Sequence, residues 1–93
     1  MAGHVKPLTA ATATGTGILE LDGYLFGGYD LNCDGTNEGT LIVRDGDASG
    51  AVLVDVGSIT GKNLLAPIKT ESGAIHYTIS GTGADAMLYE WKV

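Results

Sequence analysis

The sequence predicts an all-β protein: an antiparallel β-sandwich of about seven to eight short strands, with a jelly roll among the arrangements that fit. Short runs of β-branched, aliphatic and aromatic residues recur along the chain, and turn residues separate them at intervals typical of a sandwich. The 93 residues include 15 glycines and 2 prolines, a composition that favours many turns over long helices.

Two strands are predicted in the first third of the chain. The first covers residues 18–21 and ends at an Asp-Gly dipeptide that favours a turn. The second covers residues 24–32, where the adjacent Gly27 and Gly28 indicate a bulge or a close approach of another backbone.

The clearest element is a hairpin between Gly39 and Val56. Residues 40–44 and 51–56 are rich in β-branched and aliphatic side chains, as strands are. The polar residues 45–50 between them have the composition of a tight turn.

The segment after the hairpin has a weaker pattern. Residues 57–67 are predicted as a loop that crosses from one sheet to the other. A short strand follows around residues 68–70, and Pro67 favours an edge position for it because proline cannot donate a hydrogen bond to a sheet.

Two alternating segments close the chain. In residues 74–80 the apolar side chains, with Tyr77 at the centre, share one face. Residues 86–92 alternate as well, and the aromatic face is predicted to join the core through Met87, Tyr89 and Trp91.

The strands form one predicted domain, residues 17–93, and residues 1–16 form an extended N-terminal arm. The arm is rich in Thr and Ala and has neither helical nor strand periodicity. A disordered tail and an arm that orders on a neighbouring subunit both fit this composition. We expect no secretory leader and no membrane-spanning helix, because no apolar run is long enough.

The charge distribution argues against two classes of partner. The formal net charge is −6, from 5 Lys+Arg and 11 Asp+Glu, and no cationic cluster occurs. Nucleic acids and anionic membranes are bound through clustered cations, so neither is a predicted partner. Only 17% of residues are charged, which leaves a largely neutral surface of the kind that other subunits cover.

Two segments resemble the first half of a calcium-binding loop. Asp30, Asn32 and Asp34 alternate before Gly35, but the twelfth position, which should be a bidentate acid, is Leu41, and Glu38 stands at the ninth. Residues 45–50 repeat the half-pattern, with Val56 at the twelfth position. Asp, Asn, Ser and Gly are also turn residues, so structural turns are the favoured interpretation and calcium the alternative.

No catalytic, cofactor-binding or metal-binding residue is assigned from the sequence. His4 lies in the arm, His76 is predicted to point outward, and no serine lies in a G-x-S-x-G motif. Cys33 is the only cysteine, so the chain forms neither an internal disulfide nor a thiolate metal cluster. A non-enzymatic protein without a cofactor is therefore expected.

The aromatic residues have two interpretations. Most are expected in the core because they share strand faces with aliphatic residues, and a sugar-stacking surface is the alternative. The residues concerned are Tyr24, Phe26, Tyr29, Tyr77, Tyr89 and Trp91.

From about Gly17 to Trp91 the chain resembles small structural proteins of tailed bacteriophages. These proteins carry a hairpin of the form gTltvyDg-sasG-vi, to which residues 39–53 are similar, although Arg44 stands where an aromatic residue is commoner. A glycine-rich strand precedes the hairpin, as at residues 24–29, and a strand of the form ta-dv-l-Y closes the chain, as at residues 82–89.

The resemblance implies a virion component that is assembled in the host cytoplasm. The favoured function is a capsid decoration (cement) protein that packs on the shell of major capsid protein and on copies of itself, with a trimer as one arrangement, and stabilises the head. The N-terminal arm would bridge to the major capsid protein. The alternative is a tail, fibre or carbohydrate-binding module for host-surface attachment, in which Tyr24 and Tyr29 would stack on sugars.

Overall fold

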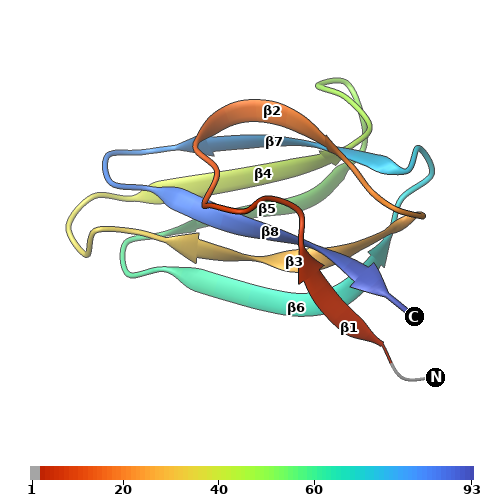
Figure 1. The fold of residues 1–93 in the computed structure, drawn as a ribbon. Helices are drawn as coiled ribbons and strands as arrows, with labels where there is room; N and C mark the ends of the chain where they lie inside the picture. The colour runs from red at the N-terminus through yellow and green to blue at the C-terminus, as the bar shows by residue number, and fades with distance from the viewer. Residues whose placement is uncertain (1–2) are drawn as a thin grey trace.

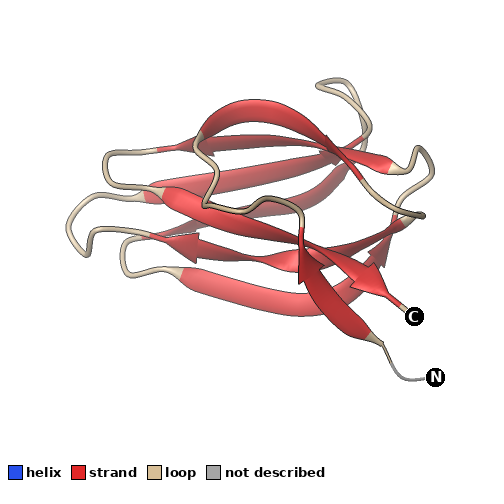
Figure 2. Ribbon diagram, viewed as in Figure 1, coloured by secondary structure: helices blue, strands red, loops and turns tan. Residues whose placement is uncertain are grey.

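The computed structural model describes residues 3–93 and contains two four-stranded antiparallel sheets that pack face to face (Figure 1). Sheet A has the order β1-β8-β3-β6 and comprises β1 (His4–Pro7), β8 (Asp85–Lys92), β3 (Leu25–Asn32) and β6 (Lys62–Lys69). Sheet B has the order β2-β7-β4-β5 and comprises β2 (Gly15–Glu20), β7 (Ala74–Ser80), β4 (Gly39–Asp45) and β5 (Val52–Ser58). The described residues contain no helix, and so none that could span a membrane (Figure 2).

This strand order is that of an eight-stranded jelly roll. Of the connections between successive strands, only the β4–β5 hairpin stays within one sheet, and every other connection crosses between sheets. The predicted antiparallel sandwich is therefore confirmed, and the hairpin predicted between Gly39 and Val56 is its one local pairing.

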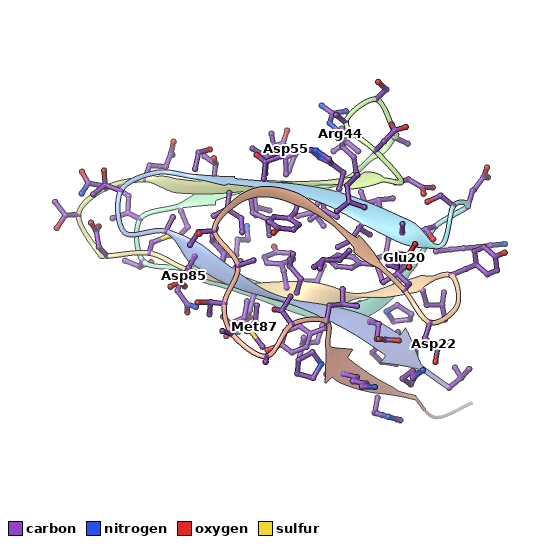
Figure 3. All side chains as sticks on the ribbon, turned by 45° about the horizontal axis from the view of Figure 1, so that its top comes forward. Glu20, Asp22, Arg44, Asp55, Asp85 and Met87 are labelled. Carbon is purple, nitrogen blue, oxygen red and sulfur yellow. The ribbon has the colours of Figure 1, made fainter. Side chains whose placement is uncertain are left out.

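The core lies between the sheets and follows the alternation of the strands. Side chains from both layers fill the space between them (Figure 3). The largest fully buried apolar side chains come from four strands, β3, β4, β7 and β8, and each contributes about 1.5–3 kcal/mol by leaving water. They are Phe26, Leu31, Leu41, Val43, Ile75 and Leu88.

The predicted bulge in β3 is confirmed. The register of β3 against both β6 and β8 shifts between Phe26 and Gly28. A Cβ atom on Gly27 would lie 2.6 Å from the backbone of Glu90, so this position has no room for a side chain. Because the bulge adds one residue, Phe26 and Tyr29 both point into the core.

The prediction for the faces of β8 is wrong. Ala86, Leu88 and Glu90 are the buried residues of this strand, whereas Met87, Tyr89 and Trp91 alternate with them and face outward, half-buried. Two aromatic rings from the adjacent β3 already occupy the interior beside β8, so smaller side chains face inward there.

The separate arm predicted for residues 1–16 also needs correction over residues 3–16; residues 1–2 lie outside the described part of the chain. His4–Pro7 pairs with β8 as an edge strand of sheet A, and Ala13 forms a bridge with Ala86. Gly15 already belongs to β2. An edge strand needs backbone groups on only one side, so this segment joins the sandwich without an apolar alternation.

The segment after the hairpin contains a longer strand than expected. β6 spans Lys62–Lys69, where a short strand around residues 68–70 was predicted after a loop. Its edge position agrees with the prediction from Pro67. Six of its eight residues are exposed, so the strand lacks a clear apolar alternation.

Candidate functional site

The first calcium half-motif forms a turn that uses its own carboxylate. Asp34 accepts hydrogen bonds from the backbone N–H groups of Thr36 and Asn37, at 2.8 and 2.7 Å, and from the side-chain amide of Asn37 at 2.8 Å. These bonds, above all those from Asn37, hold the pKa of Asp34 below its ordinary value. Asn32 donates its amide to Asp85 at 2.9 Å. The carboxylate of Asp34 therefore serves the turn, and Asn32 makes a contact between β3 and β8.

In the second half-motif, Asp45 links the end of β4 to the connection between β6 and β7. Asp45, at the end of β4, accepts hydrogen bonds from Ser72 Oγ at 2.5 Å and from the backbone N–H of Glu71 at 2.8 Å, both in the β6–β7 connection. These bonds lower the pKa of Asp45, with the serine hydroxyl as the larger cause. Asp47 caps the hairpin turn by accepting the N–H of Ser49 at 2.8 Å.

No metal site or nucleophile–base pair emerges from the part of the chain that is described. Residues 3–93 contain no group of three His, Cys, Asp or Glu side chains that could hold a metal ion. A hollow of about 660 Å³ is lined by Asp45, Lys69, Glu71 and Ser72 among others, and neither histidine lines it. His76 lies instead on the outer face of sheet B, opposite Arg44 in the register. Asp45 and Ser72 in this hollow make the turn contacts described above.

A small ion-pair network closes the end of the sandwich near the C-terminus. Lys92 donates to Asp22 in the β2–β3 connection, and its Nζ lies 3.5 Å from Oε1 of Glu90. The bond lowers the pKa of Asp22 and raises that of Lys92. The Glu90 side chain is only 9% exposed, and Oε1 makes no hydrogen bond within the described residues, so Lys92 is the charge that balances it.

The outer face of sheet A carries an aromatic-rich apolar strip, which Asp30 and Asp85 border at the Met87 end. Tyr89 and Trp91 on β8 face away from the core, and the register places Pro7 and Val5 of β1 beside them. On the other side, Gly28 lies opposite Tyr89, and Leu65 of β6 lies opposite Gly28. We call this strip the outer band; its residues are Val5, Pro7, Leu65, Met87, Tyr89 and Trp91.

The outer band has the composition of a protein-binding surface. Tyr, Trp and Met are enriched at interfaces and charged residues are depleted at their centres. Leu65 is 55% exposed, while Tyr89 and Trp91 are half-buried and therefore held in place. The alternation of β8 groups Met87, Tyr89 and Trp91 on one face of the strand. The prediction assigned that face to the core, because alternation alone does not show which face of a strand is buried.

A second exposed feature is Tyr24, in the β2–β3 connection. Its side chain is 59% exposed, and its backbone carbonyl accepts hydrogen bonds from both the N–H and the hydroxyl of the fully buried Thr70, at 2.7 and 2.9 Å. A Cβ atom on Gly73 would lie 3.6 Å from the ring, so one edge of the ring rests against this turn. Hollows of about 340 and 370 Å³, lined by Glu20 and Glu71 respectively, flank it.

The other proposed sugar-stacking residue is not available at the surface. Tyr29 is 2% exposed and belongs to the core, and burial raises the pKa of its phenol. Of the aromatic residues predicted from the sequence, Phe26 and Tyr29 are core residues and Tyr77 packs against the core.

Comparison of the chain with protein-family models, with curated proteins and with solved structures found no match.

Proposed function

We propose that this protein is a non-enzymatic structural component of a bacteriophage particle, a decoration protein that packs on the major capsid protein shell and stabilises the head. The sequence resemblance supplies the phage context. The observation that carries the proposal is the outer band, an apolar surface in which Tyr89, Trp91 and Met87 lie along β8.

The fold supports this function in two further respects. Jelly rolls are common among viral capsid and lectin domains, which act by presenting surfaces. The outer band lies on sheet A, while polar residues such as Thr40, Thr78 and Ser80 occupy the outer face of sheet B. The two faces therefore differ as expected of a subunit with one side on a shell and the other in water.

Attachment to particles tests the proposal. Purified protein is mixed with capsids assembled from the major capsid protein of the same genome, and the bound fraction is measured by co-sedimentation. Tyr89→Lys should weaken binding at least tenfold, about 1.4 kcal/mol, because a charge would then lie in the centre of the buried contact. Ile42→Lys, on the outer face of sheet B, is the matched control and should bind as the unmodified protein does. Equal binding by both variants, or no binding by the unmodified protein, would contradict the proposal.

The second candidate is a carbohydrate-binding module for host attachment, and Tyr24 is the observation that favours it. An exposed aromatic ring beside the carboxylates of Glu20 and Glu71 offers a stacking surface and acceptors for sugar hydroxyl groups.

A glycan array separates the two candidates. If the protein is a carbohydrate-binding module, it binds defined glycans, Tyr24→Ala abolishes this binding, and Tyr89→Lys leaves it unchanged. A decoration protein gives no glycan signal, and Tyr24→Ala then binds capsids normally.

A further inference from the structure

One lateral edge of the sandwich carries most of the exposed large apolar side chains. In residues 3–93 seven such side chains are at least 44% exposed, and four of them lie on β5, on β6 or in the turn between them. These are Val52 at 49%, Ile59 at 47%, Leu64 at 44% and Leu65 at 55%. β5 and β6 are the end strands of their sheets, so this edge also presents backbone without a neighbour.

The backbone groups that β6 directs outward can be identified. The carbonyl oxygen of Leu64 points at Gly28 on β3, since a Cβ atom on Gly28 would overlap it. Backbone groups alternate in direction along an antiparallel strand, so Asn63, Leu65 and Pro67 direct theirs away from β3. Asn63 and Leu65 therefore each present an N–H and a C=O, whereas Pro67 presents a C=O alone.

We propose that two copies of this chain associate through β6, antiparallel across a two-fold axis, so that sheet A continues from one copy into the other. Leu64 lies on the axis opposite Leu64 of the second copy. Asn63 of each copy pairs with Leu65 of the other, and the two pairs exchange four backbone hydrogen bonds.

Pro67 disfavours the registers that shift the pairing toward the end of β6. A register that places Pro67 opposite Asn63 or Leu65 loses hydrogen bonds, because proline has no N–H to donate. With Asn63 opposite Leu65, Pro67 lies beyond both hydrogen-bonded pairs, opposite Gly61, and Lys62 is offset from Lys69 of the second copy. This register also gives both Asn63 and Leu65 a complete pair of backbone hydrogen bonds within β6.

The charge of β6 suits a second copy. β6 has two lysines and no acidic residue in a chain of net charge −6, whereas the neighbouring edge strand β5 carries Asp55. Pairing along β6 therefore places no carboxylate of one β6 strand opposite a carboxylate of the other.

The mass of the protein in solution tests the pairing. Light scattering after size-exclusion chromatography should give twice the chain mass of 9.5 kDa. Leu64→Lys places like charges together on the axis and should give a monomer. Ile18→Lys, which changes an aliphatic side chain of 57% exposure on the opposite edge, is the matched control and should remain a dimer.

Disulfide cross-linking tests the register and does not depend on a destabilising variant. Opposed residues of a non-hydrogen-bonded pair have Cα atoms about 4.5 Å apart, within the range of a disulfide. In a Cys33→Ser background, Leu64→Cys should therefore form a covalent dimer under mild oxidation. Leu65→Cys should not, because its partner in the second copy is Asn63.

Other outcomes would overturn the two-fold pairing. The pairing is wrong if the protein is a monomer at every concentration or a trimer. It is also wrong if Leu64→Lys remains a dimer, or if Leu65→Cys cross-links faster than Leu64→Cys. If the protein is monomeric and Leu64→Lys instead loses capsid binding, the β6 edge is an attachment site for the shell. The inference refines the packing on copies of itself that the resemblance to phage decoration proteins implies. Its test uses the purified protein alone, so a failure of capsid binding leaves it standing.

Discussion

At the scale of single residues, the closest backbone packing in sheet A occurs at Gly28. Its φ is +108°, a conformation that side chains disfavour, and the carbonyl of Leu64 occupies the space that a Cβ atom would need. Gly28→Ala should lower the free energy of unfolding by about 3 kcal/mol, from backbone strain and the displacement of β6 together. Urea denaturation followed by tryptophan fluorescence measures this change.

Gly35 is the matched control for this substitution. It also has a positive φ, +87°, but nothing lies within 4 Å of a Cβ atom built there. Gly35→Ala should therefore lower the free energy of unfolding by only about 1–2 kcal/mol, which is the strain of placing a side chain at a positive φ. If the two variants were equally stable, the contact between Gly28 and β6 would not be a close one, and the outward direction assigned to Leu65 would lose its support.

The sequence predicts the roles of Asp34 and Asp45 only in part. Asp34 and Asp45 were predicted to act in turns because Asp, Asn, Ser and Gly gather around them, and both carboxylates do accept turn hydrogen bonds. That Asp45 bonds to Ser72, 27 residues away, could not be predicted, because a jelly roll brings together connections that are distant in sequence. The same holds for Lys92 and Asp22.

At the scale of elements, prediction succeeded where one strand carries its own signal. β4, β5 and β7 lie in sheet B and alternate between core and solvent, so their positions follow from period-two patterns. β1 and the first part of β6 are edge strands with little buried surface, and no pattern marks them.

The N-terminal segment is part of the sandwich, which changes how its deletion must be interpreted. Removal of residues 1–16 would delete β1, expose the edge of β8 and shorten β2 by two residues. Loss of capsid binding after this deletion would therefore report damage to the sandwich and not the loss of a free arm. The surface substitution Tyr89→Lys is the sharper test, since it leaves every strand in place.

At the scale of the whole molecule, crossing connections hold the two sheets in register. All connections except the β4–β5 hairpin pass from one sheet to the other. Asp22 fixes the β2–β3 connection, Asp34 fixes the β3–β4 connection, and Asp45 fixes the β6–β7 connection. The stability of the sandwich is therefore tied to the ionisation of three carboxylates.

The stability of the protein should consequently depend on pH on the acid side. Hydrogen bonds lower the pKa of Asp22, Asp34 and Asp45 in the folded state, from an ordinary value of 3.8. A lowered folded pKa gives stability that is complete above the unfolded value and is lost as the pH falls through the folded one. The free energy of unfolding, measured in urea, should stay level from pH 7 to about pH 5 and fall steadily below about pH 4.

The variant Asp45→Asn tests the part that Asp45 plays in this pH dependence. It should have a lower free energy of unfolding than the unmodified protein at pH 7 and should lose less of it on acidification, so that the stability curves of the two proteins converge at low pH. Asp55→Asn, which removes an exposed carboxylate from the outer face of sheet B, is the control for net charge and should keep the slope of the unmodified protein. Parallel curves for Asp45→Asn and the unmodified protein would mean that the bonds to Ser72 and Glu71 do not contribute to folding.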